Sequence, residues 1–325
     1  MSTRHFLQST TCRALVAALL TAGAALAAAA EPYPDRPIQL VVPFAAGGGL
    51  DQNARAFGQA LAEVLKTTVV VTNRDGAAGT IGMQYVAGAR PDGYTLAFTP
   101  AVPLTSEPHR LKTLAYKLAS FEPVCHVFDN IFAIAVPAAS PIKDMRDLLE
   151  RARAKADALS YGTSGTGSIP HLGTADIEAA TGVKLVHVPY KGDGPMFQDL
   201  LGGRLDFGAM LASSVTGHVQ SGSLRLIAVY ADRRHPAFPN VPTLRESGVD
   251  VVQLSFGGLL APAATPRPVL DTLQSACERA AKSPVYLEWA QKAGQVVDYR
   301  PAAAFDERLK QDSQAKAAVI QRLGL

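Results

Sequence analysis

The sequence is poor in the residues that build metal sites and disulfide scaffolds. Its 325 residues include three cysteines, and its seven histidines form neither a His-Glu-x-x-His motif nor a Cys/His cluster with metal-ligand spacing. We therefore expect no metal and no cofactor. Two cysteines, Cys125 and Cys277, lie far from the N-terminus and far from each other. In an oxidising compartment they either pair or remain separate buried thiols, and their spacing does not decide between the two.

Catalytic signatures are also missing. Residues 162–166 read Gly-Thr-Ser-Gly-Thr, which lacks the final glycine of a nucleophile elbow. No glycine-rich loop ends in the Gly-Lys-Ser/Thr of a Walker motif, and Gly47 and Gly49 are followed by Gln52 rather than by the third glycine of a dinucleotide site. His171, close to Ser168, is either a base beside a nucleophile or a hydrogen-bonding residue at a helix start. We predict no catalytic residue, and a secreted α/β enzyme is the remote alternative.

Long apolar runs are confined to the N-terminus. Arg4 and Arg13 precede an alanine-rich stretch at 14–30 that ends in an Ala-x-Ala pattern, which predicts a secretory signal peptide over residues 1–30. The formal net charge of +3 falls to about +1 without these two arginines, so nothing favours nucleic acid or a membrane surface as partner. The remaining chain is expected to be exported.

Strand-like and helix-like segments alternate along this remaining chain. Short β-branched runs predict strands at 38–44, 68–72, 94–99, 131–136, 184–188, 205–209 and 224–230. Apolar residues at helical spacing predict helices at 144–156, 172–180, 195–201, 269–281 and 302–321. This alternation predicts an α/β protein with parallel sheets covered by helices, and its length predicts two domains.

Two glycine-rich strand-to-helix junctions are the most informative features. Residues 43–51 read Pro-Phe-Ala-Ala-Gly-Gly-Gly-Leu-Asp, and Asp51 is placed to cap the following helix. Residues 160–168 carry three more glycines among hydroxyl side chains. Each junction is either an ordinary turn that connects a strand to a helix or a site where backbone N–H groups and a helix N-terminus bind an anion. If the two loops face each other, they suit a carboxylate held by main-chain amides.

Ordered motifs along residues 33–325 resemble the tripartite tricarboxylate transporter receptors, also called Bug receptors. They include Pro-Asp-Gly-Tyr-Thr-Leu at 91–96, Tyr-Gly-x-Ser-Gly-x-Gly at 161–167 and His-Val-Pro-Tyr-Lys-Gly at 187–192. Further matches lie at 33–44, 47–55, 71–82, 199–203, 239–243 and 258–266. The resemblance implies a type II periplasmic-binding-protein fold, in which two α/β domains flank a ligand cleft and close by a hinge. The implied domains are 31–131 plus 253–325, and 132–252.

The resemblance places the binding residues on the two loops and on the turn near position 190. Asp51 either fixes the first loop or faces the ligand, His171 braces the second loop, and Lys191 is either a charge in the cleft or a solvated side chain. The predicted ligand-binding set is Phe44, Ala45, Gly47, Gly48, Asp51, Ser164, Gly165, Thr166, Gly167, Ser168, His171, Tyr190, Lys191 and Ser213.

The resemblance also implies a monomeric periplasmic receptor that captures a small carboxylate and delivers it to a two-component membrane permease, or else feeds a sensor protein. Three places depart from the family pattern. Leu50 stands where Ser or Thr is usual, residues 100–104 are apolar, and Met210 and Leu211 replace a polar pair. These departures predict a ligand with one carboxylate and an apolar or aromatic body.

Overall fold

The computed structural model describes residues 33–111, 113–154 and 159–325. The chain from Arg36 onward forms one compact unit, to which all of the following refers, and residues 33–35 belong to the unit before it. The predicted signal peptide at 1–30 lies outside the described residues.

The first sheet has six strands in the order β11-β4-β10-β3-β1-β2. Strand β1 pairs in parallel with β2 and β3, whereas β10 is antiparallel to β3 and β4, and β11 is antiparallel to β4. The bounds are β1 (Ile38–Val42), β2 (Val69–Asn73), β3 (Thr95–Pro100), β4 (Phe121–Asn130), β10 (Ser255–Pro262) and β11 (Val296–Pro301).

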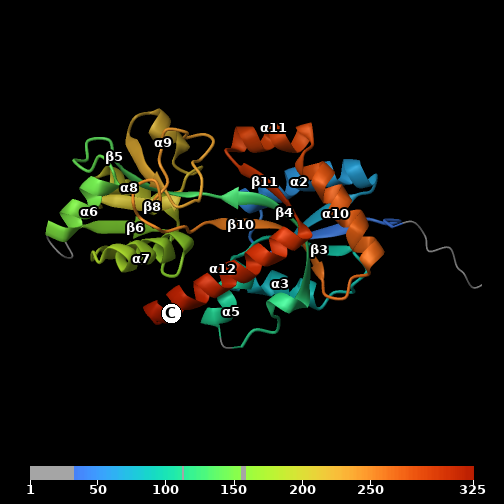
Figure 1. Ribbon diagram of the computed structural model, residues 1–325. Helices are drawn as coiled ribbons and strands as arrows, with labels where there is room; N and C mark the ends of the chain where they lie inside the picture. Colours follow the sequence, from blue (N-terminus) through green and yellow to red (C-terminus); the bar gives the residue numbers. More distant parts are fainter. Residues whose placement is uncertain (1–32, 112, 155–158) are drawn as a thin grey trace, which may run out of the picture. The chain divides into compact units, whose positions relative to one another are not determined.

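The second sheet has five strands in the order β7-β6-β8-β5-β9. Strand β6 is parallel to β7 and β8, and β5 is antiparallel to β8 and β9. The bounds are β5 (Phe132–Pro137), β6 (Ser160–Thr163), β7 (Val186–Pro189), β8 (Phe207–Leu211) and β9 (Leu224–Val229). In Figure 1 these elements are coloured from green to yellow.

The prediction of parallel sheets is therefore wrong in part, because both sheets are mixed. The strands that run against the others are β10 and β11 in the first sheet and β5 in the second. Strand β4 ends at Asn130 and β5 begins at Phe132, so the chain leaves the first sheet and enters the second with one residue between them. The chain returns to the first sheet at β10, whose first residue is Ser255.

Strand β10 depends on two glycines where it lies between β3 and β4. A Cβ atom on Gly257 would lie 2.3 Å from the Thr99 carbonyl oxygen, and one on Gly258 would lie 2.1 Å from the Cys125 carbonyl oxygen. Both distances are far inside van der Waals contact, so neither position accepts a side chain in this backbone. The register of β10 with β4 shifts at these glycines, as is typical of a bulge.

Helices flank both sheets. The long helix α2 (Gly49–Leu65) buries Ala54, Phe57 and Leu61, which recur at helical spacing, and it ends at Lys66 in the left-handed conformation. Helix α12 (Ala302–Leu323) contacts β4, α4 and α7, so it packs on elements attached to both sheets (Figure 1). The others are α3 (Thr80–Ala87), α4 (Val102–Thr105), α5 (Glu107–Arg110), α6 (Met145–Ala154), α7 (Ile169–Thr181), α8 (Asp193–Leu201), α9 (Thr216–Gln220), α10 (Arg267–Ala281), α11 (Pro284–Ala293) and the 3₁₀ turns η1 (Ala77–Gly79) and η2 (Leu118–Ser120).

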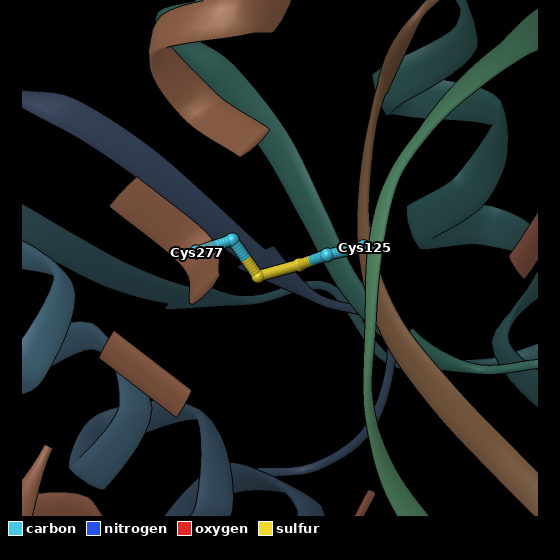
Figure 2. The surroundings of a disulfide bond; sticks show 2 residues. All are labelled: Cys125 and Cys277. Carbon is cyan, nitrogen blue, oxygen red and sulfur yellow. A yellow bond between two sulfur atoms is a disulfide. The ribbon is translucent and has the colours of Figure 1, made fainter. Parts of the chain in front are cut away.

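Cys125 and Cys277 form a disulfide, which answers the question that their spacing left open. Figure 2 shows the bond between β4, which carries Cys125, and α10, which carries Cys277. Their Cα atoms are 6.5 Å apart, and both residues are fully buried. The bond joins the strand that leads into the second sheet to a helix that follows the return from it.

Candidate functional site

The first glycine-rich loop leaves a helix N-terminus without a side-chain cap. Strand β1 ends at Val42, and α2 begins at Gly49 with Gly48 as its N-cap. Gly48 has no side chain, so the first N–H groups of α2 receive no capping hydrogen bond from it. Residues 45–49 are exposed. The positive end of the helix dipole is thus accessible to an anion.

Asp51 lies inside the first turn of α2, so the prediction that it caps the helix is wrong. Its carboxylate accepts hydrogen bonds from the Gly47 N–H at 2.8 Å, from Arg55 Nε at 3.0 Å and from Asn73 Nδ2 at 3.0 Å. Burial alone would raise the pKa of Asp51, but these hydrogen bonds hold it below its usual value. Asn73 also donates to the Phe44 carbonyl at 3.0 Å. Asp51 therefore acts as an ionised brace that fixes the loop.

The second glycine-rich loop has the same design. Strand β6 ends at Thr163, and α7 begins at Ile169 with Ser168 as its N-cap, whose side chain makes no capping hydrogen bond. The Gly167 N–H donates to His171 Nδ1 at 2.9 Å, which confirms the prediction that His171 braces this loop. Gly165 and Gly167 have φ values of +134° and +76°, which side chains disfavour.

A pair of stacked histidines supports this second loop. The rings of His171 and His187 stack with centroids 4.0 Å apart, and His187 Nε2 lies 2.7 Å from Thr163 Oγ1. Burial lowers the pKa of both rings, that of His187 to about 4 with a further contribution from His171. Both rings are therefore neutral near pH 7, and His171 Nδ1 is free of a proton to accept the Gly167 N–H.

The turn after β7 packs against the second loop. The Tyr190 N–H donates to the Thr163 carbonyl at 2.9 Å, and the Tyr190 hydroxyl donates to Asp199 at 2.7 Å. Burial and then Asp199 raise the pKa of Tyr190 to about 12. Lys191 is exposed. Tyr190 thus holds the turn in place, and its neighbour presents a cation to solvent.

A cavity of about 260 Å³ lies beside the N-terminus of α2. Its wall combines residues after β1, residues at the exit of β8 and residues of α11. It is lined by Gly49, Leu50, Gln52, Asn53, Phe128, Asn130, Leu211, Ser213, Trp289, Ala293 and Gln295. Ser213 is the member of the predicted binding set among these described lining residues. The structure therefore joins the first loop and Ser213 to this cavity, but it places residues 164–168 outside its wall.

Several residues of this cavity were missed by sequence reasoning. Trp289 lies on α11, a helix that the sequence did not predict. That helix is attached to α2 because the Tyr286 hydroxyl donates to Asn53 Oδ1 at 2.7 Å. Gln295 donates to the Asp129 carbonyl at 2.9 Å, next to the point where β4 leads into β5. These contacts join segments more than 150 residues apart, and no local pattern signals them.

One cluster among the described residues has the donor atoms of a metal site, namely His126, Asp129 and Asp298. Arginines already occupy its carboxylates. Arg233 Nη2 lies 2.8 Å from Asp129 Oδ2, and Arg308 Nη1 lies 2.9 Å from Asp129 Oδ1. Burial would raise the pKa of Asp129, but His126 and the two arginines hold it below its usual value. The arrangement is a buried ion-pair network between β4, β11, α12 and the segment after β9.

Comparisons with known proteins agree with the resemblance read from the motifs. The family described as "Tripartite tricarboxylate transporter family receptor" matches residues 53–325. The chain is 32% identical over 325 residues to a UPF0065 protein of Cupriavidus necator, covering 100% of this chain and 99% of that one. It is 33% identical over 273 residues to the protein BugT of Bordetella pertussis, covering 83% of this chain and 84% of that one.

Solved structures show the same fold. A TctC solute-binding protein from Polaromonas, without ligand, matches with a TM-score of 0.82 and 30% identity over 89% of this chain and 99% of that chain. An R. palustris protein solved with adipate has a TM-score of 0.75 and 28% identity, covering 90% and 98%. A Rhodopseudomonas palustris protein with bound malate matches with a TM-score of 0.70 and 27% identity. The match covers 89% of this chain and 100% of that chain.

These neighbours confirm the predicted type II periplasmic-binding-protein fold. The matched family is described as a receptor family and the Polaromonas neighbour as a solute-binding protein, which confirms that the protein is a receptor and not an enzyme. Among the helices of the described residues, none has the length and apolar character needed to cross a bilayer. The chain belongs to the tripartite tricarboxylate transporter receptor family.

Proposed function

We propose that the protein is a periplasmic receptor that captures a small carboxylate between two domains, 31–131 plus 253–325 and 132–252. Its predicted signal peptide would export it, and as a monomer it would deliver the ligand to a two-component permease. Relatives solved with adipate and malate support a carboxylate as the ligand class. The division into domains is supported by the two sheets, between which the chain passes at Ile131.

The observation that carries the proposal is the pair of glycine-rich loops that each follow a strand and end at a helix N-terminus without a side-chain cap. Gly48 at α2 and Ser168 at α7 both leave the first turn of a helix to other acceptors. Such a terminus stabilises an anion by about 0.3–1 kcal/mol, and by up to about 2 kcal/mol when partly buried. Micromolar affinity needs about 8 kcal/mol, so hydrogen bonds and burial of the ligand body supply most of the binding free energy.

The cavity beside α2 favours a ligand with an apolar body. Leu50, Phe128 and Trp289 line it together with Leu211. Aromatic and aliphatic surfaces of this kind bury an aromatic or alkyl group well, whereas a second carboxylate would have to lose its hydration there. We therefore propose an acid with one carboxylate and an apolar or aromatic body.

The test is a binding panel on the protein without residues 1–30. Benzoate, nicotinate, adipate, malate and citrate are titrated by calorimetry, with thermal shift as a second readout. A ligand at 100 times its dissociation constant raises the free energy of unfolding by about 2.7 kcal/mol. We expect a monocarboxylate with an apolar body to bind at least tenfold more tightly than citrate. Tighter binding of citrate would contradict the apolar pocket, and no binding of any acid would contradict the proposed ligand class.

A matched pair of variants tests the role of the helix terminus. Gly48 has extended φ/ψ angles, and a Cβ atom added there would lie 3.5 Å from the Ala45 carbonyl oxygen, so Gly48→Asp fits sterically. The new carboxylate would cap α2 and repel a bound acid, so we expect weaker binding without loss of thermal stability. Pro266→Asp places the same cap on α10, away from both loops, and is expected to leave binding unchanged.

A further inference from the structure

A second cavity, of about 480 Å³, lies between α11 and the segment that follows β9. One wall is formed by α11 and the start of β11, a strand of the first sheet. The other wall is formed by residues 235–237, which follow the last strand of the second sheet along the chain. Pockets that bind small molecules usually measure about 300–1,000 Å³, so this cavity is large enough for one.

The wall of this cavity is uncharged and mostly aliphatic. Leu287 and Ala290 of α11, Val296 of β11 and Pro236 all contribute apolar surface. Of the described residues that line the cavity, none is Asp, Glu, Lys or Arg. A carboxylate would lose its hydration here without meeting a cation, whereas an apolar body would be buried favourably. The cavity therefore favours an uncharged ligand.

His235 supplies a hydrogen-bond donor to this apolar wall. The residue is 3% exposed, and burial lowers the pKa of its ring to about 4, so the ring is neutral near pH 7. Nδ1 accepts the Ala237 N–H at 3.1 Å, which leaves the single ring proton on Nε2. Within the part of the chain that the structure describes, Nε2 makes no hydrogen bond to protein. A buried donor without a protein partner is rare, and this one is free to serve a ligand.

Gln295 separates this cavity from the one beside α2, because it lines both. Its amide nitrogen donates to the Asp129 carbonyl at 2.9 Å, and its Oε1 accepts from Asn53 Nδ2 at 3.3 Å. Both ends of the amide are thus held in place. A gap lined by Ser213, His235 and Gln295 lies between the cavities and measures about 10 Å³. That is about the volume of one water molecule, so a ligand in one cavity does not extend into the other.

We propose that the cavity between α11 and residues 235–237 is a second binding site, which takes a small uncharged molecule with an apolar body and a carbonyl oxygen. The carbonyl oxygen accepts a hydrogen bond from His235 Nε2, and the body packs on Leu287, Ala290 and Val296. This site goes beyond the proposed function, because it needs no carboxylate and uses no residue of the predicted binding set.

Acetophenone and toluene are the probes that test this site. They have the same aromatic ring, but only acetophenone carries a carbonyl acceptor. Both are titrated into the protein without residues 1–30, and NMR of isotope-labelled histidine follows His235 Nε2. We expect acetophenone to bind about 2- to 10-fold more tightly than toluene and to shift the Nε2 resonance of His235. Absence of this shift at saturating acetophenone would overturn the inference.

Two substitutions of His235 separate the ligand contact from the local fold. His235→Asn keeps an acceptor near the position of Nδ1 for the Ala237 N–H but removes the Nε2 donor. We expect it to lose the preference for acetophenone over toluene with little change in melting temperature. His235→Gln keeps a donor near the position of Nε2 and lacks the local acceptor, so it should melt earlier and retain the preference. Retention of the preference in His235→Asn would contradict the role given to Nε2.

A filled cavity tests whether the two sites are distinct. Ala237 is exposed, so Ala237→Phe can place a ring in the cavity without disturbing a buried position. We expect it to abolish acetophenone binding and to change the dissociation constant of benzoate by less than about threefold. Ala139→Phe, at an exposed alanine in the turn after β5, is the control and should bind both as the wild type does.

The outcomes for the two sites are distinguishable. Loss of both acetophenone and benzoate binding in Ala237→Phe would show one shared site and overturn the inference. Unchanged acetophenone binding in this variant would place the probe elsewhere and also overturn it. Acetophenone binding at His235 in a protein that binds no acid of the panel would remove the proposed function and leave this second site standing.

Discussion

Leu50 makes the end of the first loop apolar where it lines the cavity beside α2. It follows the uncapped start of α2 and lines the same cavity as Trp289. Asp51 after it braces the loop through hydrogen bonds, whereas Leu50 lines the cavity. A leucine there removes a hydroxyl beside the proposed carboxylate site and adds apolar surface to the pocket.

We expect Leu50→Ser to reverse the proposed preference. Loss of buried apolar contact should weaken binding of benzoate by on the order of tenfold, and the new hydroxyl should strengthen binding of malate. Calorimetric titration of both acids measures the two changes. Leu201→Ser removes a leucine that is 41% exposed at the end of α8 and is the control. Parallel weakening of both acids would show that Leu50 only shapes the loop.

The loops could be predicted from the sequence because their information is local. Glycines, hydroxyl residues, Asp51 and His171 all lie within a few positions of the turns that they hold. Trp289 could not be predicted, because its place in the cavity wall depends on how α11 packs against α2.

At the scale of elements, the unit β6–α7–β7 is held by neutral histidines. His187 on β7 hydrogen-bonds to Thr163 at the end of β6, and its ring stacks on His171 of α7. Protonation of His171 Nδ1 would remove the acceptor of the Gly167 N–H. Protonation of both rings would place two positive charges on stacked groups. Acid should therefore weaken the second loop before it unfolds the rest.

We expect stability to fall between about pH 6.5 and about pH 4. The pKa of His187 is about 4 in the folded protein against an unfolded value of 6.5, so the unfolded chain binds more protons in this window. The stabilising contribution is complete above pH 6.5 and is lost as the pH falls toward 4. Chemical denaturation at several pH values measures it, with His187→Gln as the comparison.

His187→Gln should flatten this pH dependence but not abolish it, because burial also lowers the pKa of His235 to about 4 and that of His171. An identical pH profile in the variant would contradict the role given to His187. His218 lies on α9, a helix without buried residues, and offers a control variant, His218→Gln.

The predicted elements and the missed elements differ in a physical way. Segments with continuous β-branched residues or clear helical spacing, such as β1, β3, β9 and α10, lie where they were predicted, within a few residues. The missed strands β4, β10 and β11 contain charged residues, proline or paired glycines. Their place in the sheet is set by neighbours far along the chain, as the contact of Gly257 and Gly258 with β3 and β4 shows. These are also the strands that make the first sheet mixed.

At the scale of the whole molecule, the disulfide closes a long segment of the chain into a loop. Cys125 and Cys277 are 152 residues apart, and the loop that they close contains every strand of the second sheet. A bond that closes so long a loop removes much of the entropy of the unfolded chain. It also joins β4, which leads into the second sheet, to α10 beside the first.

We expect loss of this bond to lower the free energy of unfolding by about 2–5 kcal/mol. Urea denaturation of the wild type with and without reductant measures the loss. The double variant Cys125→Ala/Cys277→Ala should have the same free energy of unfolding as the reduced wild type, and the reductant should not change it. Equal midpoints for the oxidised and reduced wild type would show that the bond does not constrain the unfolded state.

The same bond determines which part of the chain carries tension when the molecule is pulled. Force applied through the two ends of the chain passes from Cys125 directly to Cys277, so the 152-residue loop and the sheet inside it carry no tension. Roughly 500 Å of contour length is thereby kept out of reach of a pulling force. A machine that pulls the chain through a pore from either end would encounter the second sheet inside a covalently closed loop. This loop cannot be extended as a single strand until a reductant breaks the bond.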